Sequence, residues 1–326
     1  MKHRIASIAR HSTLAVAIAA TAGLNAFATP ALAAGIVVRD ARNKSVEVAD
    51  SSRIVSIGGA VTEILYGLGF EERIVGVDST SVFPDAALRD KPNVGYMRQL
   101  SPEGILGLNP SLVLATQGAG PKETIAVLEA AKIPMVIIPE TFSEEGLLDR
   151  IKLVGDAMGA GSRTACLTTA VVGDLAQLRE LRGKITKPVR VMFVMSLLNG
   201  RAMVAGSNTA ANEIIALSGG VNAVEGYDGY KTITDEAIVA AKPEVVLTIG
   251  RGKDTLEAQA IYAHPAFALT PAVQTKSFIS MEGLYLLGFG PRTAAAARDL
   301  SLLLYPSLAR AADGFTPAAL TANCRQ

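Results

Sequence analysis

The chain is poor in histidine and lacks tryptophan: it has three histidines and no tryptophan among its 326 residues. His3 and His11 lie in an N-terminal segment that we expect to be removed, which leaves His264 as the only histidine of the mature protein. Zinc sites are commonly built from several histidines, so a site of that kind is excluded. The absence of tryptophan also disfavours a ligand pocket with a tryptophan wall.

The chain also has few cysteines and no large excess of either charge. Cys166 and Cys324 are too few for a disulfide scaffold, and in an oxidising compartment they either pair or stay as two free thiols. There are 31 basic and 30 acidic residues, which gives a formal net charge of +1. Binding to nucleic acid depends on many positive charges, so this nearly neutral chain is not a candidate for that class.

The first 33 residues have the composition of a secretory signal peptide. Lys2, Arg4 and Arg10 precede the apolar run LAVAIAATAGL, and Ala31-Leu32-Ala33 matches an A-x-A cleavage site. The apolar run is too short for a membrane span. Cleavage near Ala33 removes three positive charges and no acid, so the formal charge goes from +1 to −2. No cysteine stands directly after the cleavage site, so we predict export to the periplasm without a lipid anchor.

Short apolar runs alternate with helical patterns along the rest of the chain. Runs of this kind are typical of parallel β-sheets that are covered by helices on both faces. We therefore predict an α/β fold. The predicted strands are RIVSIG (53–58), RIVGVD (73–78), SLVLAT (111–116), PMVIIP (134–139), RVMFVM (190–195), EVVLTI (244–249) and SFISME (277–282). Two shorter segments, GIVVRD and SVEVAD, predict a small hairpin in front of them.

One passage of the sequence occurs twice. GYMRQLSPE (95–103) leads through a helical segment to NPSLVLATQGAG, and GYKTITDE (229–236) leads in the same way to KPEVVLTIGRGK. The repeat predicts two Rossmann-like lobes, 34–160 and 186–326, which face each other across a ligand cleft. Tyr96 and Tyr230 then occupy matching positions on its two walls.

The segment between the lobes, 161–185, predicts one long helix. Its apolar residues recur at steps of three and four. These residues are Leu167, Val171, Leu175, Leu178 and Leu181. About twenty helical residues span roughly 30 Å. Because a helix is stiffer than a Gly/Ser linker, we expect the lobes to hinge by only a few degrees.

Five stretches carry a resemblance to a known family: RIVSIGGAVTEILYGLG, VGYMRQLSPEGILGLNPSLVLA, AMVAGSNTAANEIIALSGGVNA, GYKTITDEAIVAAKPEVVL and LLGFGPRT. The chain resembles the haem-binding periplasmic proteins of bacterial haem ABC importers. These belong to the substrate-binding proteins whose lobes share one rigid backbone helix, together with cobalamin and siderophore carriers. The resemblance implies a protein that captures haem between its lobes and delivers it to an inner-membrane ABC permease with its ATPase.

The resemblance implies that Tyr96 ligates the haem iron. Ferric iron favours an anionic oxygen donor, and tyrosine ligation of haem is known in catalase. A free phenol has a pKa near 10, so the phenolate needs stabilisation. Arg98, two residues further along, is placed to favour the ionised form. The alternative is that Tyr96 is a turn residue that packs at a domain edge.

Five further residues are candidates for contact with haem. We interpret Tyr230 as a pocket wall or hydrogen-bond donor, or as a simple packing residue, and Met203 as an apolar contact with the porphyrin. Haem carries two carboxylates, which call for cations in a mostly apolar cleft. Arg251 follows a predicted strand, where ligands usually bind, and is the first choice for a propionate, with Lys231 and Arg201 behind it. The alternative for each of these three cations is that it is a solvated surface charge and does not contact a ligand.

The family comparison also predicts one haem b per chain. Some relatives hold a second haem through a histidine in the segment that here reads SLLNGRAMVAG, but Leu198 and Asn199 stand there instead. We expect His264 to be structural, Met97 to contact the porphyrin and Arg292 to cap or brace the last helix.

Glu103 and Glu236 occupy matching positions near the start of two short helical segments. In cobalamin and siderophore relatives the corresponding acids dock into arginine pockets of the permease. The alternative is a first-turn residue that only interacts with the helix dipole. We expect a monomer whose partners are this permease and, indirectly, an outer-membrane haem receptor.

The alternative functions are a cobalamin or ferric-siderophore carrier and, from another class, an enzyme on a doubly wound fold. The Gly-rich segments at 56–59 and 118–120 do not complete a dinucleotide fingerprint. The chain has no G-x-S-x-G elbow and no usable histidine for a triad. We therefore predict a binding protein and not an enzyme.

Overall fold

In the computed structural model, which describes residues 1, 3, 35–250, 252 and 255–325, the first lobe contains a four-stranded parallel sheet. Its strands, in sheet order, are β4 (Ile74–Val77), β3 (Ile54–Ile57), β7 (Leu112–Thr116) and β8 (Met135–Ile138). All four coincide with predicted apolar runs, and nearly all of their side chains are buried. The predicted leader lies almost wholly outside the described residues.

Smaller elements complete the first lobe. The predicted front hairpin is confirmed as the antiparallel pair β1 (Ile36–Arg39) and β2 (Ser45–Val48). A second antiparallel pair, β5 (Gly95–Tyr96) and β6 (Gln99–Leu100), carries the first Gly-Tyr motif. The helices are α1 (Gly59–Gly67), η1 (Glu71–Arg73), α2 (Ala86–Asp90), α3 (Pro102–Leu106), α4 (Lys122–Ala130) and α5 (Glu144–Ala157).

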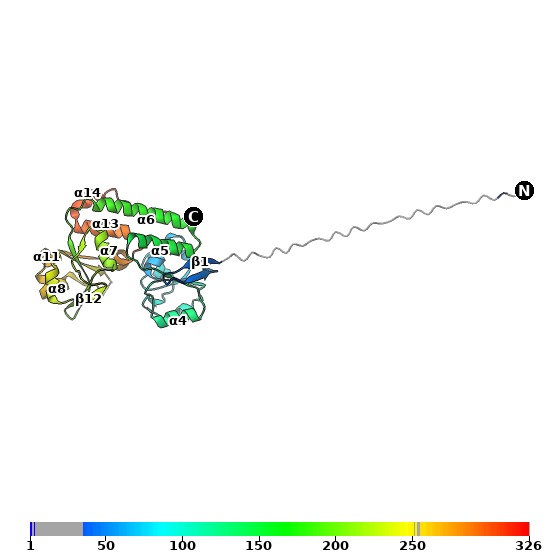
Figure 1. Ribbon diagram of the computed structural model, residues 1–326, viewed down its shortest axis with the longest axis horizontal. Helices are drawn as coiled ribbons and strands as arrows, with labels where there is room; N and C mark the ends of the chain where they lie inside the picture. The colour runs from blue at the N-terminus through cyan, green and yellow to red at the C-terminus, as the bar shows by residue number, and fades with distance from the viewer. Residues whose placement is uncertain (2, 4–34, 251, 253–254, 326) are drawn as a thin grey trace. The chain divides into compact units, whose positions relative to one another are not determined.

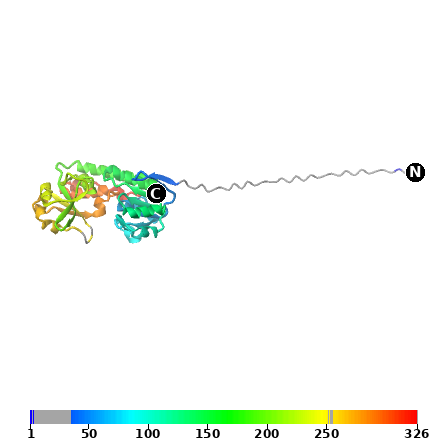
Figure 2. The same ribbon diagram turned by 60° about the horizontal axis from the view of Figure 1, so that its bottom comes forward.

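The predicted connecting helix is α6 (Gly161–Arg182), 22 residues long. The five apolar residues that predicted it are all buried. At 1.5 Å per residue this helix spans about 33 Å. It packs on α5 of the first lobe and on α13 (Thr293–Leu304) of the second, so it runs along both lobes (Figures 1 and 2). Both lobes belong to one compact unit, Gly35–Gln326.

The second lobe differs from the sequence prediction because its sheet is mixed. The parallel core of the sheet consists of β9 (Arg190–Leu198), β13 (Val245–Gly250) and β14 (Phe278–Glu282), as predicted. Beyond that core β9 turns back at Asn199 and Gly200 into β10 (Arg201–Ala205), which pairs antiparallel with β9 and with β12 (Tyr230–Thr232). Both turn residues have positive φ, 50° and 72°, which matches the Asn-Gly preference of two-residue hairpins.

One short strand and several helices complete the second lobe. β11 (Val221–Asn222) pairs in parallel with β9. The remaining helices are α7 (Ala210–Leu217), α8 (Asp235–Ala241), α9 (Ala258–Tyr262), α10 (Pro265–Ala268), α11 (Pro271–Gln274), α12 (Gly283–Leu287), η3 (Pro306–Leu308), α14 (Ala309–Ala312) and α15 (Ala318–Thr321). No helix in the part of the chain that the structure describes is both long and apolar enough to cross a membrane.

Buried polar contacts join the two lobes. Arg150 on α5 is 2% exposed and donates to the carbonyl oxygens of Gly288 and Phe289 in the second lobe, at 2.9 and 2.7 Å. Arg292 forms a bidentate pair with Glu63 on α1, at 2.6 and 3.1 Å. It therefore braces α13, as predicted, but does so by bonding to the opposite lobe. One hydrophobic core also runs through both lobes and α6, so the joint between them is packed as well as bonded.

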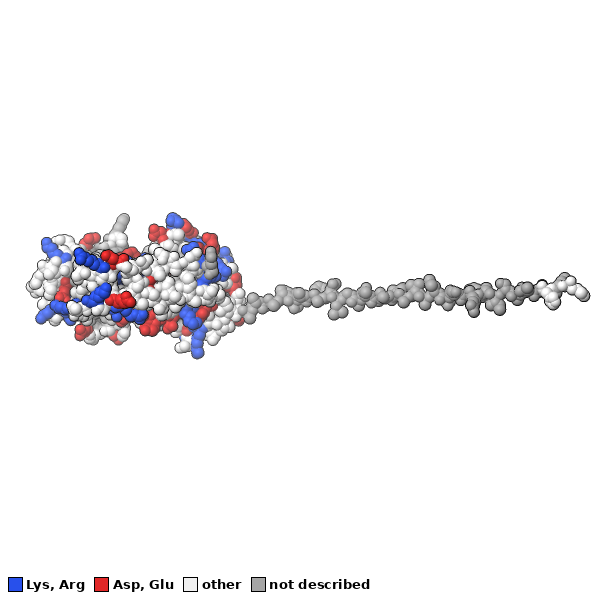
Figure 3. Space-filling model, turned by 90° about the horizontal axis from the view of Figure 1, so that it is seen from above, with Lys and Arg blue, Asp and Glu red and all other residues white. Residues whose placement is uncertain are grey.

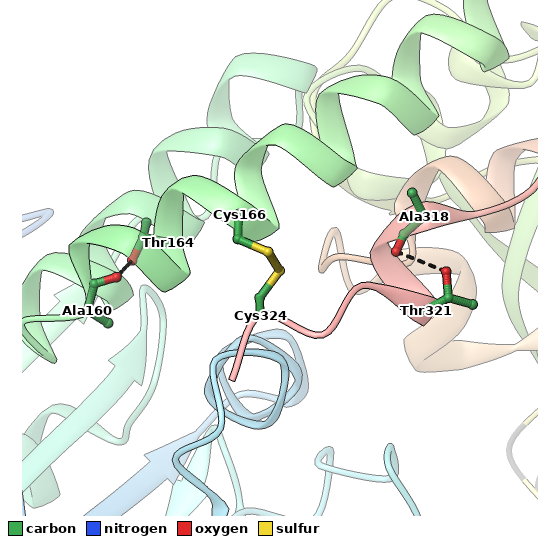
Figure 4. The surroundings of a disulfide bond; sticks show 6 residues. All are labelled: Ala160, Thr164, Cys166, Ala318, Thr321 and Cys324. Atoms are coloured by element: carbon green, nitrogen blue, oxygen red, sulfur yellow. Dashed lines mark hydrogen bonds between the residues drawn. A yellow bond between two sulfur atoms is a disulfide. The ribbon is translucent and has the colours of Figure 1, made fainter. Parts of the chain in front are cut away.

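A disulfide joins Cys166 to Cys324, which settles the question that the sequence left open (Figure 4). It links the first half of α6 to the C-terminal segment. That segment is held at two further points. Asp174 accepts hydrogen bonds from the backbone N–H groups of α15, and Arg325 pairs with Glu71 of the first lobe at 2.6 Å. The last residues of the predicted second lobe thus pack on the connecting helix and the first lobe.

Candidate ligand-binding site

The first candidate wall is the β5–β6 hairpin, which lies at the carboxyl edge of the first-lobe sheet. The backbone N–H of Ser79, just after β4, donates to Gly95 O at 2.8 Å. On the other side, Gly120, just after β7, donates to Met97 O and accepts from the Leu100 N–H, both at 2.9 Å. These bonds fix the hairpin to the edge where ligands usually bind in parallel sheets.

Tyr96 and Arg98 form a direct pair on this hairpin. Arg98 Nη1 donates a hydrogen bond to Tyr96 Oη at 2.7 Å. Tyr96 is 40% exposed, so the residue that carries this bond lies at the surface of the lobe. Met97, between them, turns the other way and packs in a core of the first lobe.

Asp78 organises the loops beside this hairpin, and the sequence analysis did not identify it. Its buried carboxylate accepts from the Gly58 N–H at 2.8 Å, from the N–H and hydroxyl of Thr80, and from the hydroxyl of Ser81. These bonds tie the turn after β3 to the loop after β4. The sequence signal for Asp78 was its place at the end of the predicted strand 73–78, directly before Ser and Thr residues.

The second candidate wall is the β10–β12 ladder, where the structure brings three predicted residues onto one face. Met203 pairs with Thr232, and Ala205 pairs with Tyr230. Residues opposite each other or two apart on a strand share a face, so Arg201, Met203 and Tyr230 lie on the same side. Tyr230 also packs edge-on against Phe193 of β9, with ring centroids 6.3 Å apart.

Two other predicted cations are not placed on this face. Lys231 pairs with Val204 and therefore points to the opposite side of the ladder from Tyr230. There its Nζ lies 4.8 Å from the centre of the Tyr227 ring. Arg251 lies outside the described residues, so its role stays a prediction.

Glu103 and Glu236 occupy equivalent positions in their helices. Each is the second residue of a short helix, α3 or α8, and a side-chain hydroxyl caps each helix, from Ser101 and from Thr234. Both glutamates are exposed. Hydrogen bonds from their own backbone N–H groups and from the capping hydroxyls lower the pKa of both carboxyls. Two ionised acids thus stand at the same position of each lobe.

His264 has a structural environment. It caps α10: its Nδ1 accepts from the Ala266 N–H at 3.2 Å, and its Nε2 lies 2.8 Å from Gly200 O in the β9–β10 turn. Both ring nitrogens are therefore engaged. Within the described ranges, no group of three His, Cys, Asp or Glu residues is arranged to hold a metal ion. On the face shown in Figure 3, basic and acidic side chains are interspersed.

Two solved structures are similar to this chain over most of its length. The periplasmic heme-binding protein RhuT from Roseiflexus sp. RS-1, in apo form, is 38% identical with a TM-score of 0.75, covering 79% of this chain and 100% of that one. The periplasmic heme-binding protein BhuT, in complex with two hemes, has the same identity and TM-score and covers 80% of this chain and 100% of that one.

Sequence relatives include carriers of more than one kind. The uncharacterized ABC transporter substrate-binding lipoprotein YvrC of Bacillus subtilis is 26% identical over 275 residues, which are 83% of this chain and 86% of that protein. A cobalamin-binding protein of Halobacterium salinarum is 28% identical over 226 residues, 68% of this chain and 60% of that protein. The model of the periplasmic binding protein family matches residues 54–283. This chain belongs to the periplasmic binding protein family.

Proposed function

We propose that this chain is a periplasmic haem carrier, which binds ferric haem b between its lobes and delivers it to an inner-membrane ABC permease. The observation that carries the proposal is the hydrogen bond from Arg98 to the hydroxyl of Tyr96, a residue exposed at the surface, at 2.7 Å. The likeness to two heme-binding periplasmic proteins, each at 38% identity, supports the same cargo. Relatives of this family bind and transport their substrates, so no catalytic step is assigned.

Tyr96 is proposed as the axial ligand of the iron. Ferric iron is a hard cation that prefers an anionic oxygen, and tyrosine is an established haem ligand. Arg98 already donates to the Tyr96 hydroxyl, and it would keep this bond to the same oxygen once iron is bound. A single protein–iron bond suits a carrier, because only that bond must be broken when the cargo is handed over.

The second wall is proposed to hold the porphyrin and its propionates. Tyr230 and Met203 present apolar surface on one face of the β10–β12 ladder, and Arg201 follows on the same face. Arg201 and the predicted Arg251 are the proposed propionate partners. Lys231 is the weaker candidate, because it lies on the opposite face over Tyr227.

Delivery is proposed to depend on Glu103 and Glu236. Their equivalent places in α3 and α8 give one exposed acid per lobe, an arrangement that fits a two-fold symmetric permease. The protein is proposed to act as a monomer in the periplasm after cleavage near Ala33. Haem would come from an outer-membrane receptor, and the permease would be driven by its ATPase.

A hemin titration of residues 34–326 tests this proposal. We expect one haem per chain and a ferric tyrosinate spectrum. Tyr96→Phe should lose this spectrum and at least about 100-fold in affinity, because phenylalanine cannot ligate iron. The matched control is Tyr262→Phe, which removes a tyrosine hydroxyl that donates to Lys276 O on the second lobe. Wild-type affinity and spectrum in Tyr96→Phe would remove Tyr96 from the site.

Other endpoints of the titration have defined meanings. Two haems per chain would match the two-heme state of the similar structure and correct the predicted stoichiometry. No saturable hemin binding would refute the haem proposal. The same titration with cobalamin, which the relative from Halobacterium salinarum binds, or with a ferric siderophore would then identify the cargo.

A further inference from the structure

Residues 313–325, which we call the C-terminal strap, run from the second lobe to the first. Near the start of the strap, Arg298 of α13 donates to Phe315 O at 3.4 Å, and its guanidinium lies 5.1 Å from the centre of the Phe315 ring. At the other end, Arg325 pairs with Glu71 of the first lobe at 2.6 Å. The strap therefore begins on one lobe and ends on the other.

Between these ends the strap is attached to α6 at three points. The Thr316 N–H donates to the Gln177 side chain at 3.3 Å. The first two N–H groups of α15 donate to the buried carboxylate of Asp174, at 2.6 and 3.0 Å. Cys324 is then bonded to Cys166, as Figure 4 shows. As the strap goes forward its contacts go backward along α6, so it runs antiparallel to this helix.

The two halves of α6 are held by different lobes. In the first half, Arg163 donates to Leu68 O at 2.8 Å, and its guanidinium lies 4.0 Å from the centre of the Phe70 ring. In the second half, Leu181 packs with Leu308 of η3. The disulfide therefore ties a segment of the second lobe to the part of α6 that is fixed to the first lobe.

The strap has little slack between its attachments to Asp174 and to Cys166. From Ala319 to Cys324 the chain advances by five residues, which span at most about 17 Å when fully extended. The two attachment points on α6 are eight residues apart, which is about 12 Å along the helix. Because α15 stays helical up to Thr321, the chain is shorter than its extended limit. A rotation of the second lobe away from the first half of α6 would therefore pull on the disulfide.

The covalent bond, more than the polar contacts, makes this attachment firm. The side chains of Arg325 and Glu71 are 53% and 25% exposed, and exposed ion pairs contribute little. The hydrogen bonds to Asp174 hold the strap only to the middle of α6. The bond to Cys166 is therefore the contact that stays closed when the lobes move.

We propose that the C-terminal strap is a second connector between the lobes, which limits how far they open and thereby slows the escape of cargo. The inference rests on the proposed function for the identity of that cargo. The hydrogen bonds of Arg150 and Arg292 between the lobes can break and form again during opening, whereas the disulfide cannot. A restraint that fits only the present angle between the lobes lowers the population of open forms.

Double electron–electron resonance on the apoprotein tests the restraint. Spin labels at Glu123→Cys on α4 and Gln274→Cys on α11, both exposed positions, report the distance between the lobes. Mass spectrometry checks that the native disulfide is intact in the labelled protein. With Cys166→Ser/Cys324→Ser we expect a broader distribution that extends to longer distances. Without the labels, the same double variant should transfer hemin to excess apomyoglobin about three- to tenfold faster than the wild type, because open forms are more populated.

Two variants make the result specific. Arg325→Ala keeps the disulfide and removes only the exposed pair, so its effect should have the same direction and be smaller. Ile261→Ala leaves a cavity in a second-lobe core that is built from other residues, and it should lower Tm without broadening the distribution or speeding the transfer. This variant separates the loss of a restraint from a loss of stability.

The outcomes separate this inference from the proposed function. If the wild type binds no hemin, the proposed function fails, while the distances in the apoprotein still test the restraint. Equal distributions in the wild type and the double serine variant, both folded below their Tm by circular dichroism, would overturn the inference. A broadened distribution with an unchanged rate of hemin transfer would also overturn it, because opening would then not control the escape of cargo. An equal effect in Ile261→Ala would do the same, because lower stability alone would explain it.

Discussion

Removing the disulfide should destabilise this protein by several kcal/mol. Cys166 and Cys324 are 158 residues apart, so their bond closes more than half of the mature chain into one loop. In the chain-entropy treatment, a closed loop of about that length restricts the unfolded state by about 5 kcal/mol. The bond also holds the C-terminal segment against α6, and that segment bonds to Asp174 on α6 and to Glu71 of the first lobe.

Scanning calorimetry measures this effect. For a protein of this size about 5 kcal/mol corresponds to a fall in Tm of about 10 °C. We expect that fall in the Cys166→Ser/Cys324→Ser variant, and in the wild type once a reductant has exposed two thiols. The reductant should leave the double variant unchanged, which serves as the control. A fully reduced wild type with an unchanged Tm would refute the loop-entropy argument, and two free thiols in the untreated protein would refute the bond itself.

Three further results are expected. Arg98→Ala should leave haem bound but alter the tyrosinate charge-transfer bands and the redox potential in spectroelectrochemistry; unchanged values would contradict its role beside the phenolate. Glu63→Ala should lower the free energy of unfolding in urea by about 3–5 kcal/mol, because it leaves the largely covered Arg292 guanidinium, 12% exposed, without its carboxylate partner, and a loss below 1 kcal/mol would show that the pair does not brace the lobes. Glu103→Arg with Glu236→Arg should abolish haem uptake by cells while hemin binding in solution persists, and normal uptake would rule out docking through these acids.

Local features of this protein were predictable from the sequence. The buried strands of both lobes appear as apolar runs, because a strand covered on both faces has no polar side to show. The Tyr96–Arg98 bond joins residues two apart on a tight hairpin, so their proximity follows from the covalent chain. The equivalence of Glu103 and Glu236 also follows from local capping, since each stands two residues after a Ser or Thr cap.

The second-lobe sheet was only partly predictable. The Asn199-Gly200 pair is a recognised hairpin signal, yet the apolar run before it predicted only a parallel strand. In the structure β9 continues beyond the parallel core and turns back into β10, which pairs antiparallel with β9 and β12. That extension decides which face each residue occupies, so Lys231 and Tyr230 are neighbours in the sequence but lie on opposite sides of the ladder.

The sequence by itself determined the two-lobed α/β plan, the connecting helix and the tyrosine–arginine pair, because each depends on residues close together in the chain. The tertiary structure alone decided which distant groups meet. Arg292 bonds to Glu63 across 229 residues, and Cys166 pairs with Cys324. These partners are selected by how the sheets and lobes pack, and no local propensity encodes that choice.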